Sequence, residues 1–297
     1  MGKELGGIIV ALVTPLTPDE DLDEGAFRKL VSHLIAEGVQ GLFPAGSTGE
    51  FYALAGEEKR RLIGWCIEEA AGRVTVMPNV GAVTTAESVA LAREAEAMGA
   101  DAVSVITPYY CQPSQAELFD HYAAICRAVR LPVLAYNNPE RAGGVALTVE
   151  TILRLARSCE HFAGIKDSTG DLTQTAELIR RCPPGFKVIM GRDTLIYGAL
   201  AYGAAGAVAA TANVAPRLCA SLYAAARAGD FPAAAALQRR LAPLRMAFGI
   251  GTFPAMLKEA LVLQGLLPSA ACRRPVGPLS AEERARLRGV LQEAGVL

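Results

Sequence analysis

The sequence predicts an α/β fold of the (β/α)8 barrel type with a C-terminal helical extension, and three observations support it. Short apolar runs alternate eight times with longer segments of helical period. Strands that alternate with helices are expected to be parallel, and eight strands close a barrel. The alternation stops after Asn213, and residues 214–297 have helical character. A doubly wound open sheet is the competing architecture, because the alternation alone fits both.

The expected strands are short and apolar. They are Ile8–Val13, Gly41–Pro44, Val74–Val80, Ala102–Ile106, Val133–Tyr136, Ala163–Lys166, Lys187–Gly191 and Ala205–Ala209. A helix is expected between the first two strands because apolar residues recur at helical spacing there: Phe27, Leu30, Val31, Leu34 and Ile35. Asp21 or Asp23 is its expected cap, and Thr85 and Thr148 are expected to cap the third and fifth helices.

The chain is expected to form one barrel with an appended helical region. Residues 1–213 would form the barrel, with its last helix continuing to about residue 228. Residues 229–297 would form helices packed on the barrel. They include part of the alanine-rich run Ala224–Ala236 and the apolar segment Phe253–Leu263, which Gly265 ends.

The composition argues against several classes of protein. With 52% hydrophobic residues, 20% charged residues and a formal net charge of -1, the 297-residue chain has the character of neither a disordered nor a nucleic-acid-binding protein. Its seven cysteines form no CxxC pair and its three histidines are scattered, so we expect no disulfide framework and no metal site. The longest apolar stretch, Ala199–Ala210, is too short to cross a bilayer, and Met1–Thr14 lacks the features of a signal peptide. A cytoplasmic protein without a membrane partner is therefore expected.

Polar clusters follow the second and fourth expected strands, where a barrel places its reactive groups. Gly46–Glu50 reads GSTGE, and two hydroxyls between glycines can present donors to a small carboxylate. Thr107–Tyr110 reads TPYY and brings two phenols to the same end of the barrel. Taken singly, the first cluster is better explained as an ordinary polar turn, and the second as tyrosines that pack or face an interface.

Two further clusters follow the fifth and sixth strands. Tyr136 ends one strand, and a phenol there can carry protons. Arg141, five residues on, can hold a carboxylate through two parallel hydrogen bonds, or can simply be solvated. Lys166 ends an apolar strand, where burial would favour a free amine that attacks carbonyl carbons. The alternative is a lysine that reaches the rim or pairs with Asp167.

The four clusters together form a set suited to imine chemistry on a 2-oxo acid. Lysine would supply the nucleophile, tyrosine the proton carrier, the hydroxyls an anion site and arginine a second carboxylate site. None of these steps needs a metal or an organic cofactor.

The same clusters, in the same order, resemble the dihydrodipicolinate synthase / N-acetylneuraminate lyase family of Schiff-base-forming enzymes. The resemblance covers nearly the whole chain, from Val13-Thr14-Pro15 to Ala212-Asn213-Val214. Between these ends lie the motifs GSTGE, TPYY, YNNPERAG, GIKDSTG and GRD. It implies a (β/α)8 barrel that binds pyruvate covalently, without a cofactor, and a homotetramer arranged as a dimer of dimers.

The resemblance also implies four catalytic residues. Lys166 would form the imine with pyruvate, and Tyr136 would pass protons to and from the substrate. Ser47 would link Tyr136 to a tyrosine of the next loop. Tyr110 matches the tyrosine that, in the synthases, reaches across a dimer interface to complete this relay. Assembly of the oligomer would then be needed for catalysis.

Four substrate-binding residues are implied in the same way. Thr48 would hold the pyruvate carboxylate, and Gly191 and Val208 would line the site with their backbones. Arg141 matches the arginine with which the synthases bind the carboxylate of aspartate semialdehyde. The sialic acid lyases usually lack this arginine, and they have a glutamate where this chain has Thr194.

These last two matches favour 4-hydroxy-tetrahydrodipicolinate synthase activity, the condensation of pyruvate with L-aspartate 4-semialdehyde. Asn138, Ala142 and the lyase-like Val80-Gly81 depart from the usual synthase pattern. An aldolase, dehydratase or deaminase acting on another 2-oxo acid through the same lysine is therefore the alternative. A barrel that only binds a small carboxylate is a more distant one.

Overall fold

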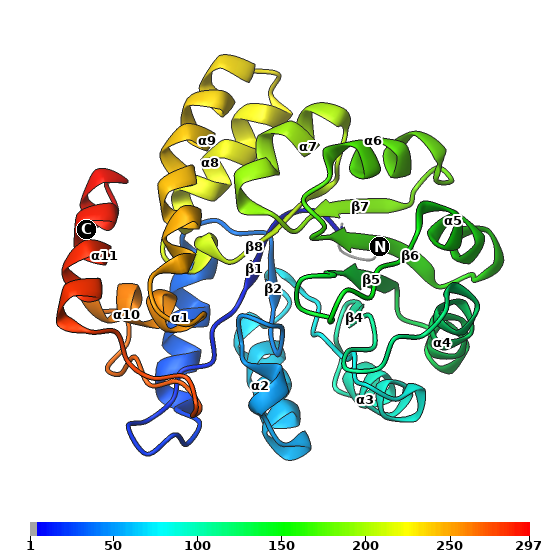
Figure 1. Ribbon diagram of the computed structural model, residues 1–297, viewed down its shortest axis with the longest axis horizontal. Coiled ribbons are helices and arrows are strands. Elements are labelled where there is room, and N and C mark those ends of the chain that lie inside the picture. Colours follow the sequence, from blue (N-terminus) through cyan, green and yellow to red (C-terminus); the bar gives the residue numbers. More distant parts are fainter. Residues whose placement is uncertain (1–4) are drawn as a thin grey trace.

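The computed structural model describes residues 5–297, and in that range eight parallel strands alternate with helices (Figure 1). The strands are β1 Gly7–Ala11, β2 Gly41–Phe43, β3 Thr75–Val76, β4 Val103–Ile106, β5 Val133–Asn137, β6 Phe162–Asp167, β7 Lys187–Met190 and β8 Gly206–Ala209. The barrel helices are α1 Glu24–Ala36, α2 Gly56–Ala70, α3 Thr85–Ala97, α4 Gln115–Ala128, α5 Val149–Ser158, α6 Leu172–Arg181, α7 Ile196–Tyr202 and α8 Pro216–Arg227.

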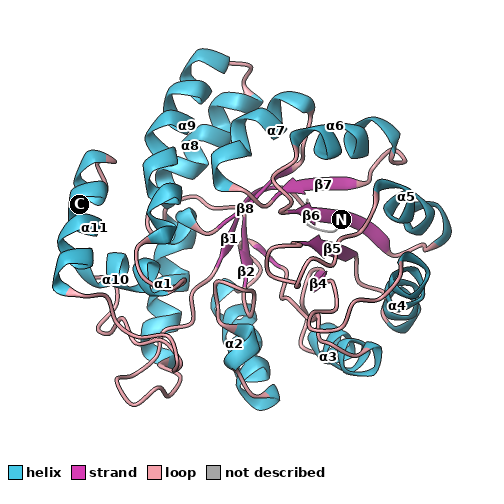
Figure 2. Ribbon diagram, in the orientation of Figure 1, coloured by secondary structure: helices cyan, strands magenta, loops and turns pink. Residues whose placement is uncertain are grey.

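The sheet closes on itself, which distinguishes the barrel from the open doubly wound sheet. Neighbouring strands pair in the order β3-β2-β1-β8-β7-β6-β5-β4. The two ends of this series meet where Asn79 and Ser104 form a parallel bridge. There the Val80 amide donates to the Ser104 carbonyl at 2.8 Å, and the Ser104 amide donates to the Pro78 carbonyl at 2.9 Å. The predicted barrel is confirmed, and the helices surround the strands (Figure 2).

The third strand was predicted too long. It covers Thr75–Val76 rather than Val74–Val80, with one further bridge at Asn79. Pro78 interrupts the expected run, because proline has no N–H to donate to a strand ladder. The other strands lie where the apolar runs predict them, with ends that differ by one or two residues.

Side chains that fix the helix starts were partly predicted. Asp23, rather than Asp21, caps α1 by accepting from the Ala26 amide at 2.9 Å. Thr148 caps α5 as expected. The cap of α3 is Thr84 and not Thr85. Thr85 lies one residue too late for this role, and its hydroxyl instead meets Nδ1 of His121 at 2.9 Å.

The chain after α8 is helical, as expected. It contains α9 Phe231–Met246, α10 Ala255–Leu263 and α11 Ala281–Glu293. Helix α9 packs along α8, and α10 contacts α11 beside the barrel (Figure 1). Their apolar side chains join the same core as the first strands, so this region is fixed to the barrel. Among residues 5–297, no helix is long and apolar enough to span a bilayer.

Candidate active site

Lys166 lies inside the barrel, near the C-terminal end of β6. Its neighbours in the sheet are Tyr136 on β5 and Ile189 on β7. The side chain is almost fully buried, at 4% exposure, and its Nζ lies 3.7 Å from the ring centre of Tyr136 and 4.1 Å from that of Phe43. Burial lowers the pKa of Lys166, although Tyr136 and Asp193 act in the opposite direction. This lysine therefore has the depressed basicity that an amine nucleophile needs.

The alternative in which Lys166 pairs with Asp167 does not hold. Adjacent strand residues point to opposite faces, and the Asp167 carboxylate has other partners. Its Oδ1 accepts from the amide and the hydroxyl of Thr169, and its Oδ2 accepts from the Thr175 hydroxyl at 2.9 Å. Asp167 thereby braces the loop after β6 and leaves the lysine directed into the barrel.

Tyr136 is positioned as a proton carrier beside the amine. Its hydroxyl lies 3.3 Å from Oγ of Ser47 and accepts from Nδ2 of Asn138 at 2.9 Å. Burial alone would raise the pKa of Tyr136. The charge of Lys166 and the hydrogen bonds with Ser47 and Asn138 outweigh burial, so this pKa lies below the usual tyrosine value. A phenol of lowered pKa releases and recovers a proton more readily.

The loop Gly46–Glu50 brings Ser47 and Thr48 to the mouth of the barrel. The Gly49 and Phe51 amides both donate to the Gly46 carbonyl, which folds the loop tightly. A side chain at Gly46 would collide with the ring of Phe43, so glycine is required there. Thr48 is buried and lines the same cavity as Lys166.

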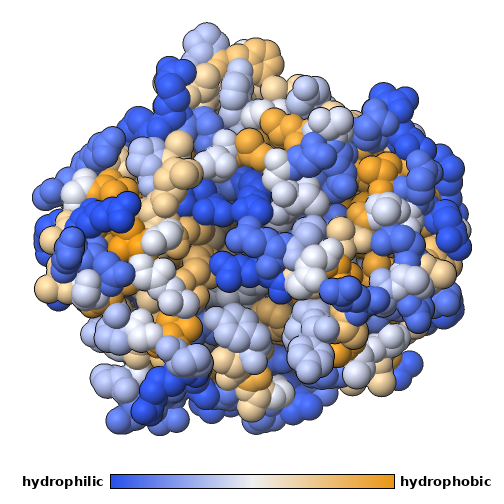
Figure 3. Space-filling model, viewed as in Figure 1, coloured by the Kyte–Doolittle hydropathy of each residue, from blue (hydrophilic) through white to orange (hydrophobic). Residues whose placement is uncertain are grey.

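A cavity of about 70 Å³ lies over Lys166, with room for a few water-sized groups. Of the eight residues predicted for the site, seven line it: Ser47, Thr48, Tyr136, Arg141, Lys166, Gly191 and Val208. A larger hollow of about 650 Å³ lies beside α8 and the C-terminus, but its described lining has no lysine nucleophile. The smaller cavity is therefore the candidate active site, because its lining carries the reactive side chains. In the space-filling view, which has the orientation of Figure 1, hydrophilic residues gather near the centre of the visible face (Figure 3).

Tyr110, the eighth predicted residue, does not reach the cavity within one chain. It follows β4, has a left-handed φ of 76° and is 96% exposed. The half-buried Tyr109 beside it packs edge-on against Phe51, with 5.5 Å between ring centres. Among the large hydrophobic side chains of the described residues, that of Tyr110 is the most exposed.

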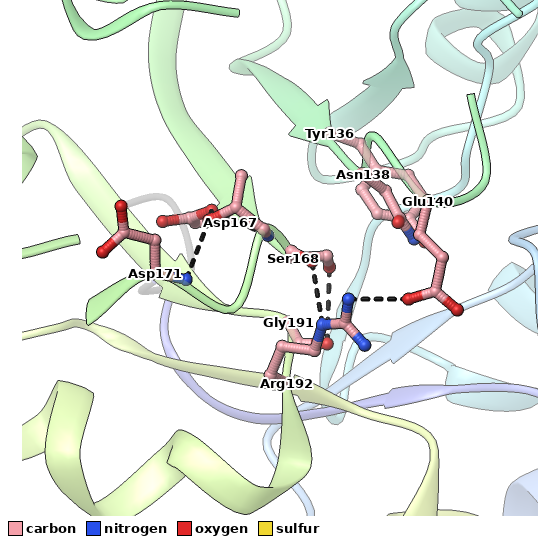
Figure 4. A network of polar contacts seen from close by, with 9 residues as sticks. Tyr136, Asn138, Glu140, Asp167, Ser168, Asp171, Gly191 and Arg192 are labelled. Atoms are coloured by element: carbon pink, nitrogen blue, oxygen red, sulfur yellow. Dashed lines mark hydrogen bonds and ion pairs between the residues drawn. The ribbon is translucent and has the colours of Figure 1, made fainter. Parts of the chain in front are cut away.

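Sequence reasoning missed several groups at the rim of the cavity. Arg192 follows β7, and its Nε donates to the Ser168 carbonyl at 2.9 Å while one terminal nitrogen lies 2.7 Å from Oε2 of Glu140 (Figure 4). Arg245 also lines the cavity, from the end of α9. Only the GRD motif pointed to Arg192, and no local pattern marked Arg245, because the packing of α9 is a long-range property.

Hydrogen bonds of buried polar side chains connect the strand ends and loops around the site. The side chain of Asn213 donates to the Ala11 carbonyl at 2.7 Å and accepts from the Val13 amide at 3.1 Å, which ties β1 to β8. Asp193 is buried and accepts from the Thr211 amide at 2.7 Å. Burial raises the pKa of Asp193, even though Thr211 and nearby cations favour the carboxylate. In the part of the chain that the structure describes, no three His, Cys, Asp or Glu residues group as metal ligands.

Known proteins are similar in sequence to this chain over nearly its whole length. Residues 4–294 match the model of the dihydrodipicolinate synthetase family. The chain belongs to this family. A 4-hydroxy-tetrahydrodipicolinate synthase of Chelativorans sp. is 41% identical over 98% of this chain and 99% of its own length. One of Brucella suis is 39% identical over 99% of both chains.

Solved structures of the family share the whole architecture. The chloride-inhibited dihydrodipicolinate synthase of Acinetobacter baumannii, complexed with pyruvate, is 36% identical. It matches with a TM-score of 0.95 over 99% of this chain and all of its own. YagE of E. coli K12, a member of the dihydrodipicolinic acid synthase family also solved with pyruvate, is 33% identical with the same TM-score over 99% of both chains. The family resemblance and the barrel inferred from the sequence are thus confirmed.

Proposed function

We propose that this protein is a 4-hydroxy-tetrahydrodipicolinate synthase, which condenses pyruvate with L-aspartate 4-semialdehyde through an imine on Lys166. The observation that carries the proposal is a buried amine of lowered pKa, packed against a tyrosine that Ser47 and Asn138 hydrogen-bond. The names of the curated relatives and the pyruvate complexes of two structural relatives support the choice of substrates.

The first half of the reaction makes a carbon nucleophile. The neutral Lys166 amine attacks the keto carbon of pyruvate, and loss of water leaves a protonated imine. Removal of a methyl proton then gives an enamine, because the imine nitrogen takes up the electron pair. Tyr136 would carry these protons, and Thr48 would hold the pyruvate carboxylate. The nitrogen itself serves as the electron sink, so this step calls for no metal or organic cofactor.

The second half forms the carbon–carbon bond. The enamine carbon attacks the aldehyde carbon of the semialdehyde, and Tyr136 would return a proton to the oxygen that develops. The amino group of the second substrate then attacks the imine carbon and displaces Lys166, which closes the ring and frees the enzyme. Arg141 would bind the carboxylate of the second substrate, and the backbones of Gly191 and Val208 would line its path.

Oligomerisation would complete the site. The exposure of Tyr110 supports a role in which this phenol inserts into the active site of a second copy of the chain. The homotetramer, as a dimer of dimers, is the assembly that fits this role, although one structural relative is a monomeric dihydrodipicolinate synthase variant. We place the enzyme in the cytoplasm with the other steps of amino-acid synthesis.

The test is covalent trapping. The enzyme is incubated with pyruvate, reduced with borohydride and digested, and the pyruvate-derived mass adduct is mapped. We expect the adduct on Lys166 alone, none in Lys166→Ala, and formation of the heterocyclic product when the semialdehyde is added. An adduct elsewhere, or full activity of Lys166→Ala, would refute the imine.

A second candidate is cleavage or dehydration of another 2-oxo acid through the same imine. Two observations support this candidate. YagE, a structural relative, is also solved with pyruvate, and Asn138 departs from the usual synthase pattern. A panel of 2-keto-3-deoxy sugar acids, 4-hydroxy-2-oxoglutarate and N-acetylneuraminate, with pyruvate release as the readout, separates the two. Release from one of these acids that is faster than condensation would replace the synthase assignment.

A further inference from the structure

Glu140 occupies a position in the site that the proposed reaction leaves without a role. It follows β5, next in the chain to Arg141, and its side chain is about half exposed at the rim of the cavity over Lys166. Figure 4 shows its carboxylate directed toward Arg192. The Arg192 contacts to Glu140 and to the Ser168 carbonyl join the loops after β5, β6 and β7 around the strand that carries the nucleophile.

The charges around this cavity are mostly positive. Lys166, Arg141, Arg192 and Arg245 line it, and the described lining contains two carboxylates, those of Glu140 and Asp193. Asp193 is buried and already accepts from the Thr211 amide, whereas Glu140 stands at the open rim. An ammonium group that enters here meets repulsion from the three arginines, so it needs an anionic partner, and Glu140 is the accessible one.

Glu140 also keeps an oxygen free for such a partner. Its Oε2 is the atom that Arg192 contacts, at 2.7 Å, which leaves Oε1 for a ligand. The hydrogen bond from Arg192 lowers the pKa of Glu140, so the carboxylate stays charged at neutral pH. Two residues earlier in the same turn, Oδ1 of Asn138 is buried without a hydrogen-bond partner and offers a second acceptor.

We propose that Glu140 binds the amino group of the second substrate, so that Arg141 and Glu140 together recognise the carboxylate and the ammonium of an α-amino acid aldehyde. Arg192 pairs with Oε2 of Glu140 and leaves Oε1 to the substrate, so the carboxylate and not the ion pair carries the recognition. This inference rests on the proposed synthase function and narrows it. A hydroxylated or neutral aldehyde of the same length lacks the group that Glu140 would bind.

The test compares two aldehydes that differ only in the amino group: L-aspartate 4-semialdehyde and succinic semialdehyde. Initial pyruvate consumption is followed with each, since succinic semialdehyde can give only a linear aldol adduct. The measured quantity is the ratio of kcat/KM for the two aldehydes. We expect Glu140→Gln to lower this ratio by about tenfold or more, as for loss of one charge-assisted hydrogen bond.

Two control variants separate recognition from structure. Arg192→Met breaks the same ion pair but keeps the carboxylate, so it should retain most of the preference for the amino aldehyde. Glu177→Gln removes a surface glutamate that pairs with Arg180 on α6, and it should change nothing. Two results would assign Glu140 a structural role and overturn the inference. One is an equal fall in kcat/KM for both aldehydes in Glu140→Gln. The other is a fall in the ratio in Arg192→Met as large as that in Glu140→Gln.

The synthase function and the role of Glu140 give different results if they are wrong. If the wild type forms a pyruvate adduct on Lys166 but consumes no pyruvate with L-aspartate 4-semialdehyde, the synthase function falls and this inference falls with it. If the wild type is an active synthase and Glu140→Gln keeps the wild-type ratio, the synthase function stands and the role of Glu140 alone is wrong.

Discussion

Nζ of Lys258 on α10 lies 2.5 Å from Oε1 of Glu50 at the end of the GSTGE loop, and both side chains are fully buried. The lysine also donates to the Ala271 carbonyl at 2.6 Å. The second oxygen of Glu50 accepts from the Arg273 amide at 2.8 Å. The C-terminal helical region thus holds the loop that presents Ser47 and Thr48 to the substrate.

Removing Lys258 should therefore affect both stability and substrate binding. Loss of one partner leaves an uncompensated buried charge, so we expect Lys258→Met to lower the free energy of unfolding by about 3–5 kcal/mol. The KM for pyruvate should rise, because the loop loses its anchor. Urea unfolding and steady-state kinetics measure the two effects.

The neighbouring residue on α10 provides a matched control. Glu259 pairs with the half-exposed Arg284, at 2.6 Å. Arg284→Met should cost no more than about 1 kcal/mol, because exposed ion pairs contribute little. Equal destabilisation by Lys258→Met and Arg284→Met would show that the buried pair does not anchor the loop.

The lowered pKa of Lys166 predicts how trapping depends on pH. The attacking species is the neutral amine, so the rate of imine formation should rise as pH passes upward through this pKa. Because burial depresses the pKa, the midpoint of the rise should lie below the pKa of an exposed lysine, near 10.4. The rate of borohydride trapping with saturating pyruvate, measured across pH, gives this profile.

Tyr136→Phe should move that profile in a definite direction. The phenol raises the pKa of Lys166 against the effect of burial, so its loss should shift the rise to lower pH. Turnover should meanwhile fall by about 10²–10⁴-fold, as expected when a proton carrier is lost. Tyr122→Phe changes a buried tyrosine that donates to the Val105 carbonyl instead, and it should leave the profile in place. A shift to higher pH in Tyr136→Phe would contradict the electrostatic account.

The residues around Lys166 could be predicted from the sequence because a (β/α)8 barrel gathers the C-terminal ends of its strands at one face. Tyr136, Lys166 and the adjacent pair Ser47 and Thr48 lie far apart in the chain. Each of these three positions lies at or just after the end of a parallel strand, and those ends meet. Strand pattern and residue type were enough to bring them together.

The parts that sequence reasoning missed depend on packing over long distances. Arg245 lines the cavity because α9 folds back over the barrel, and Lys258 meets Glu50 because α10 does. No periodicity predicts which side chain of an appended helix reaches a strand end. The prediction for β3 was too long for a local reason instead, because Pro78 has no N–H to donate to the strand ladder.

Arg141 provides a prediction about the second substrate. Its guanidinium lies 5.0 Å from the ring centre of Phe253, over the cavity. Arg141→Ala should raise the KM for the semialdehyde by tenfold or more, because a charge-assisted carboxylate contact of about 1.5–3 kcal/mol is lost. The KM for pyruvate should change little.

The control for Arg141 is another arginine stacked on a phenylalanine. Arg154 lies 4.2 Å from the ring centre of Phe119, outside the cavity. Arg154→Ala removes the same kind of cation–π contact without removing a substrate contact, so its kinetic constants should match the wild type. If both variants behave alike, the effect of Arg141→Ala comes from stability and not from substrate binding.

Tyr110 allows a test of whether the active site is shared between chains. If the phenol acts in a neighbouring copy, then Tyr110→Ala and Lys166→Ala should each be nearly inactive alone. Mixed oligomers, formed by refolding or co-expressing the two variants, should regain activity, because some sites then receive Lys166 from one chain and Tyr110 from the other. Sites that draw both residues from one chain could not be rescued in this way, so an inactive mixture with proven subunit exchange would place the function of Tyr110 within its own chain. The exposure of the Tyr110 ring within its own chain makes the shared site the expected result.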